Sequence, residues 1–142
     1  MGQKKLGLKD PKLVRSMTAF GGGIASHGGP CGALTGGVSF LGSLLGRDVP
    51  EEKDDPILWK ACREFYSRFE IEVAGKYSGM NCQDIAGVDW SDREQARAFY
   101  KGEGVVECRK NTGKAARILG EILEKYLNDQ GNKKEPSDQS RG

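Results

Sequence analysis

The sequence predicts an all-α protein, a compact bundle of four longer helices with one or two short ones. Apolar residues recur three and four positions apart in four separate segments, which is the spacing of one face of a helix. Two of those segments open with an Asp-Pro pair, in which aspartate can cap the helix and proline suits its first position. No segment shows the sustained alternation that a half-buried strand would require.

The first two predicted helices flank a glycine-rich loop. Asp10 and Pro11 open a helix over residues 11–20, whose apolar positions are Leu13, Val14, Met17 and Phe20. Residues 24–30 are predicted to form a loop. A second helix is expected from Cys31 to Leu45, where the apolar stripe consists of Leu34, Val38, Leu41 and Leu45.

Further helices follow along the chain. Asp55 and Pro56 open a helix over residues 56–75, and Asn81 can cap a short helix that Gly87 ends. Ser91, with Glu94 three residues later, predicts a capping box for the next helix. The last helix is expected over residues 105–128, after Gly104. Residues 1–128 would then form a single helical domain, and the polar segment 129–142 a disordered tail.

Composition narrows the classes of function. The net charge of +2 arises from 22 basic and 20 acidic residues interleaved along the chain, so we expect no nucleic-acid binding. The longest apolar run, residues 38–45, is too short to span a bilayer, so no membrane insertion is expected. The charged N-terminus lacks the apolar core of a signal peptide. These features predict a cytoplasmic protein whose four cysteines are thiols or metal ligands rather than structural disulfides.

Glycines crowd residues 20–37, which also hold the only histidine, His27, and the first cysteine, Cys31. Such a run is either a flexible linker or a place where backbones approach closely. The apolar stripe after Cys31 favours a loop that enters a close-packed helix. On that helix, small residues would leave a groove for another backbone: Gly32, Ala33, Gly36 and Gly37.

The cysteines fall into two groups. Cys31 and Cys82 each stand at the predicted first turn of a helix, where unpaired N–H groups and the helix dipole favour a thiolate. Cys62 and Cys108 lie on apolar stripes, and Cys62 in particular reads as a buried core residue. His27 can act as a ligand or proton carrier, although on a glycine loop it can equally be a solvated bystander.

The glycine and cysteine pattern resembles the C_GCAxxG_C_C family of small helical proteins described as redox-active. The segments that carry the resemblance are Phe20-Gly-Gly-Gly-Ile, Pro30-Cys-Gly-Ala-Leu-Thr-Gly-Gly, Asn81-Cys-Gln-Asp-Ile-Ala-Gly, and Cys108 with the following Lys114-Ala-Ala. The resemblance covers residues 7–127 and leaves out Cys62. It implies site cysteines at Cys31, Cys82 and Cys108, framed by Gly29, Gly32, Ala33 and Gly36. The family's N-terminal cysteine has no counterpart in residues 1–30.

The resemblance implies a redox function without naming a substrate or an electron partner. Thiolates of Cys31, Cys82 and Cys108 would converge and either hold an iron–sulfur cluster or another soft metal, or cycle between dithiol and disulfide. A metal would need a fourth group from Cys62, His27, a partner subunit or a bound small molecule. The protein would then be an oxidoreductase or an electron-transfer component.

Two other interpretations remain open at the level of sequence. The chain can be a non-catalytic helical interaction module with structural buried cysteines, whose glycine groove forms a homodimer or partner surface. Alternatively, the helix start near Cys31 can bind a small anion through its exposed N–H groups.

Overall fold

The computed structural model describes residues 2–131, with side chains described as far as residue 128, and this part of the chain is all-α without a strand, as predicted. The helices are α1 (Gly2–Lys5), α2 (Pro11–Ser16), α3 (Gly32–Leu45), α4 (Pro56–Arg68), α5 (Cys82–Ala86), α6 (Arg93–Lys101) and α7 (Glu103–Gly131). Two short segments are wound differently from an α-helix: η1 (Thr18–Phe20) is a tighter 3₁₀ turn, and η2 (Phe69–Val73) is a wider π turn.

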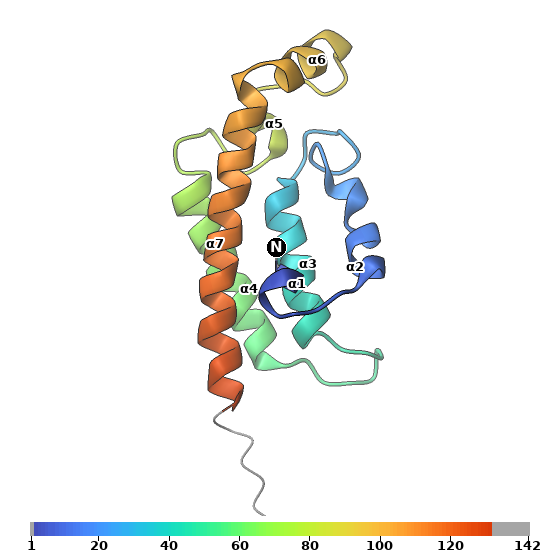
Figure 1. Ribbon diagram of the computed structural model, residues 1–142, viewed down its shortest axis with the longest axis vertical. Helices are drawn as coiled ribbons and strands as arrows, with labels where there is room; N and C mark the ends of the chain where they lie inside the picture. The colour runs from blue at the N-terminus through green and yellow to red at the C-terminus, as the bar shows by residue number, and fades with distance from the viewer. Residues whose placement is uncertain (1, 132–142) are drawn as a thin grey trace, which may run out of the picture.

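The long helix α7 organises the molecule. Figure 1 shows it running along the whole bundle, with α6 folded across its N-terminal end. Helices α3 and α4 pack against each other and both pack against α7, and α5 contacts α7 nearer to α6. No helix in residues 2–131 has the length and apolar character needed to cross a membrane.

Aspartate caps fix the helix starts, as the sequence predicts for two of them. Asp10 Oδ1 accepts the backbone N–H groups of Lys12 and Leu13 at 2.9 and 3.2 Å. Asp55 Oδ1 accepts the N–H of Ile57 at 2.8 Å. Each accepted bond satisfies a donor that has no partner within the helix, and such a cap stabilises a helix by about 1 kcal/mol.

The predicted capping box at Ser91 is wrong, because Asp92 caps α6 instead. Asp92 Oδ1 accepts the N–H groups of Glu94 and Gln95 at 2.8 and 3.2 Å. The Ser91 hydroxyl is engaged elsewhere, donating to Asp89 Oδ1 at 2.6 Å. A carboxylate at the N-cap also gains from the helix dipole, which explains why it prevails.

Three further differences concern helix boundaries. The sequence did not predict α1, whose four residues are too few to show a period. The helix predicted over 56–75 widens at Phe69 into the π turn, where the Ala74 N–H donates to the Phe69 carbonyl at 2.9 Å. Helix α7 includes Gly113 and Gly120 and continues past residue 128 to Gly131. The rest of the predicted disordered tail, 132–142, lies outside the described residues.

A single apolar core joins α3, α4, η2 and α7. Its largest fully buried side chains are Phe65, Phe69, Leu41, Ile118, Ile122 and Val73. Complete burial of such a side chain contributes about 1.5–3 kcal/mol. The π turn therefore keeps both Phe69 and Val73 in the core while the helix changes its winding.

A network of four charged side chains fastens the π turn to α7. Glu72 accepts from Arg68 at 2.6 Å and from Arg117 at 2.7 Å, and Glu121 accepts from the same two arginines at 2.6 and 2.7 Å. Hydrogen bonds from Arg68 and then Arg117 lower the pKa of Glu72 to about 2. The network thus helps to hold α4 and η2 in register with α7.

Gly37 tests the close packing of α3 on α4. A Cβ at this position would lie 2.3 Å from the ring of Phe65, whose side chain is fully buried. We expect Gly37→Ala to destabilise the protein by about 1–3 kcal/mol in urea unfolding, through overpacking. Gly42→Ala is the control, because a Cβ on Gly42 of the same helix meets nothing within 4 Å. It should be neutral or stabilising by up to about 1 kcal/mol, and equal effects of the two changes would contradict this packing.

Candidate redox site

The glycine-rich loop between η1 and α3 is not a linker but an ordered left-handed turn. Five consecutive residues, 22–26, have positive φ angles, and three of them are not glycine: Ile24 at 63°, Ala25 at 51° and Ser26 at 63°. Each non-glycine residue in this conformation costs about 1–2 kcal/mol. The turn is held by backbone hydrogen bonds between residues six positions apart, including Ala25 N–H to Ala19 O at 2.7 Å and Gly29 N–H to Gly23 O at 2.9 Å.

The end of this loop pairs with the start of α5. The Cys31 N–H donates to Met80 O at 3.1 Å, and the Cys82 N–H donates to Gly29 O at 2.6 Å. Between them, Pro30 and Asn81 form an isolated antiparallel bridge. These bonds bring Cys31 and Cys82, far apart in the sequence, onto neighbouring backbone segments.

Glycine is required where the two segments meet. A Cβ on Gly23 would lie 2.4 Å from Gly29 O and 2.7 Å from the Cβ of Cys82. A Cβ on Gly32 would lie 2.8 Å from Phe20 O. The glycines therefore let three backbones approach one another at the point where Cys82 is held.

Cys108, on α7, is the third cysteine of the candidate site. Burial raises the pKa of Cys82, and charge on Cys31 and Cys108 raises it further. The pKa of Cys108 is likewise raised, first by burial and then by charge on Cys31. Charge on Cys31 therefore disfavours ionisation of both Cys82 and Cys108.

The expectation that the helix start lowers the pKa of Cys82 is wrong. Helix α5 has only five residues, so its dipole is weak, and the thiol is partly buried beside two other cysteines. Desolvation and like charge therefore exceed the dipole. Cys31 stands at the N-cap of the much longer α3, with no side-chain bond of its own.

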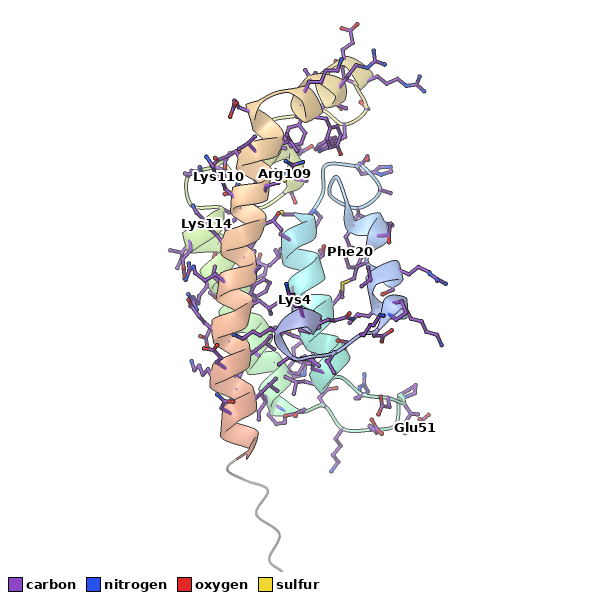
Figure 2. All side chains as sticks on the ribbon, in the orientation of Figure 1. Lys4, Phe20, Glu51, Arg109, Lys110 and Lys114 are labelled. Carbon is purple, nitrogen blue, oxygen red and sulfur yellow. The ribbon has the colours of Figure 1, made fainter. Side chains whose placement is uncertain are left out.

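Cys82 and Cys108 both line a cavity of about 300 Å³ at the α6 end of α7. Its remaining lining residues are Gly22, Trp90, Phe99, Tyr100, Val105, Arg109, Thr112 and Gly113. The three aromatic rings form one cluster, with Trp90 and Phe99 edge to face at a centroid distance of 5.1 Å. Figure 2 shows Arg109 on this part of α7, whereas Lys114 lies further along the helix.

Trp90 was not predicted as a site residue, and nothing in the sequence pattern around it marks it as one. Its Nε1 atom is buried and has no acceptor at hydrogen-bond geometry among the described residues. The N–H nevertheless lies close enough to the Cys82 thiol to offset part of the rise in that pKa. A donor beside a thiol can stabilise the thiolate once it forms.

Cys62 and His27 lie apart from the three-thiol group. Cys62 packs against the core from α4, and burial alone raises its pKa, which agrees with its interpretation as a core residue. His27 is exposed, and its Nδ1 lies 2.9 Å from Ala25 O, so that nitrogen donates and Nε2 is left as the acceptor. Within residues 2–131, no three or more His, Cys, Asp or Glu side chains are grouped as a metal site requires. The metal ligands Cys31, Cys82, Cys108 and His27 therefore stay a prediction.

The predicted glycine frame divides between two places. Gly29 lies in the loop and accepts the Cys82 N–H. Gly32, Ala33 and Gly36 line a second apolar cavity, of about 250 Å³, between α3 and α2. Thr112 lines both cavities and is the residue where they adjoin.

Comparison with known proteins identifies the family of this chain. A family model described as "Putative redox-active protein (C_GCAxxG_C_C)" matches residues 1–122. The chain belongs to this family. No curated protein and no solved structure gives a significant match. The assignment of Cys31, Cys82 and Cys108 as the site cysteines of this family stays a prediction.

Gly23 tests whether the left-handed turn positions Cys82. Gly23→Ala adds both backbone strain, because φ is +71°, and a collision with Gly29 and Cys82. Gly87→Ala is the matched control, since Gly87 has φ +64° but open space around it. We expect Gly87→Ala to cost about 1–2 kcal/mol and Gly23→Ala clearly more, with faster alkylation of Cys82 as its packing loosens. Urea unfolding and mass-spectrometric alkylation rates measure both, and equal behaviour would contradict the role of Gly23.

Proposed function

We propose that this C_GCAxxG_C_C protein is a thiol-based redox protein in which Cys31 and Cys82 cycle between dithiol and disulfide. The observation that supports the proposal is the backbone pairing of residues 29–31 with residues 80–82, each segment of which carries a free cysteine. Cys31 and Cys82 are favoured as the couple because the backbone bonds between residues 29–31 and 80–82 hold them on adjacent segments.

Oxidation of this couple removes two protons and two electrons. The S–H bonds of Cys31 and Cys82 break, one S–S bond forms, and a two-electron acceptor takes up the electrons. Cys31 stands at the N-cap of α3, and its sulfur would form the S–S bond with Cys82. Cys82, whose pKa is raised, is suited to carry its proton until the step occurs.

The metal alternative rests on the thiolates of Cys31, Cys82 and Cys108, because thiolates suit iron–sulfur clusters, zinc and copper(I). The described side chains are not grouped as a three-ligand metal site, however, so the dithiol couple needs less rearrangement. We place the protein in the cytoplasm, where a reducing pool would return the disulfide to thiols.

Mass spectrometry tests the couple in the full chain. Anaerobic protein is equilibrated with buffers of oxidised and reduced dithiothreitol, alkylated and digested. We expect a reversible disulfide between Cys31 and Cys82, because backbone bonds hold the two cysteines on paired segments, and its complete loss in Cys31→Ser. Cys62→Ser is the matched control and should leave the disulfide intact, since Cys62 lies outside the group.

Two outcomes would overturn the proposal. Only free thiols at every buffer ratio would exclude the couple. Metal in stoichiometric amount after anaerobic purification, with visible absorbance that Cys31→Ser abolishes, would replace it with a metal site.

A further inference from the structure

The cavity beside Cys82 has a composition that the dithiol couple alone does not explain. Aromatic side chains of Trp90, Phe99 and Tyr100 line one side of it, although Tyr100 is 65% exposed. A thiol pair that exchanged only with reductants in solution would need no aromatic wall. A flat apolar ligand would, because aromatic faces offer large contact area to a planar ring.

Two polar features add to the aromatic wall. The Trp90 Nε1–H is buried, has no acceptor at hydrogen-bond geometry in residues 2–131, and lies beside the Cys82 sulfur, which is only a weak acceptor. Arg109 lines the same cavity and forms no ion pair with a carboxylate in that part of the chain. A ligand with a carbonyl oxygen can supply the missing acceptor, and the guanidinium can stabilise negative charge that develops on the ligand.

The thiols define what the ligand can do. Cys82 and Cys108 line the cavity, whereas Cys31 does not, and Cys82 is close to both of the others. Cys82 is therefore the thiol shared by the cavity and the proposed couple. At about 300 Å³ the cavity is at the small end for ligand sites.

We infer that the cavity binds a small quinone, which accepts the two electrons of the Cys31–Cys82 couple. This inference rests on the proposed function, for which it names the acceptor. As the disulfide forms, the two protons and two electrons released by the thiols convert the two carbonyl groups of the quinone to the hydroxyl groups of a hydroquinone. The Trp90 N–H would bind one quinone oxygen, and Arg109 would stabilise the anion formed before protonation is complete.

Duroquinone is the probe, because its ring is fully methylated and thiols cannot displace a ring hydrogen. The reduced full chain is mixed anaerobically with duroquinone, and disulfide formation and hydroquinone production are followed together. We expect one hydroquinone per Cys31–Cys82 disulfide. A second readout is quenching of Trp90 fluorescence in Trp59→Phe, which leaves Trp90 as the only tryptophan of the two in the sequence.

Neighbouring valines on α7 provide a matched pair of variants. Val105 lines the cavity, whereas Val106 is 37% exposed and does not. Val105→Phe should fill the cavity and slow duroquinone reduction by about tenfold, equivalent to about 1.4 kcal/mol. Val106→Phe should leave the rate unchanged. Oxidation by oxidised dithiothreitol, which needs no cavity, should proceed equally in both variants.

The outcomes separate the two proposals. If oxidised dithiothreitol forms the disulfide but duroquinone neither quenches Trp90 nor forms it, the quinone site is wrong and the dithiol couple stands. Equal slowing by Val105→Phe and Val106→Phe would likewise overturn the quinone site. If neither oxidant forms the disulfide, both proposals fail.

Discussion

Three backbone hydrogen bonds join the segments that carry Cys31 and Cys82: Cys31 N–H to Met80 O, Cys82 N–H to Gly29 O, and Gln83 N–H to Gly28 O. They connect the loop after η1 with the start of α5, which lies about fifty residues later in the chain. Each contributes about 1 kcal/mol by itself. Their larger effect is positional, because they decide which cysteines become neighbours.

The left-handed turn that precedes these paired segments has a strained backbone. Ile24, Ala25 and Ser26 adopt positive φ angles that their side chains disfavour. Strain of this kind persists only where the surroundings impose it, and it clusters at functional sites. Here the surroundings are the backbone bonds of residues 25–29 to residues 19–23 and the bonds to α5. The core of α3, α4 and α7 provides the rigid base on which this strained loop rests.

The helices could be predicted from sequence because their signals are local. Asp10 and Asp55 cap helices where the Asp-Pro pairs indicate, and the apolar stripe at Leu34 and Leu41 is buried as its period requires. The left-handed turn could not be predicted, because Ile24 in particular is a residue type that avoids this conformation. The choice of Asp92 over Ser91 as a cap depends on the competing bond of Ser91 to Asp89, which the spacing does not reveal.

The site was predictable only in part. The family resemblance assigns Cys108 to the site, whereas its apolar stripe alone would assign it to the core, and this assignment stays a prediction. The cavity with Trp90 and Arg109 depends on how α6 folds across α7, a long-range contact with no local signature. Gly37 of α3 faces a neighbour within the chain, because a Cβ there would collide with Phe65, whereas a Cβ on Gly36 would meet nothing within 4 Å. The most direct test of the three-thiol group is the pH dependence of alkylation at each cysteine in Cys31→Ser. Removal of the Cys31 charge should lower the pKa of both Cys82 and Cys108, so that both react at lower pH, whereas Cys62→Ser should not change them. Unchanged reactivity of Cys82 and Cys108 in Cys31→Ser would contradict the account.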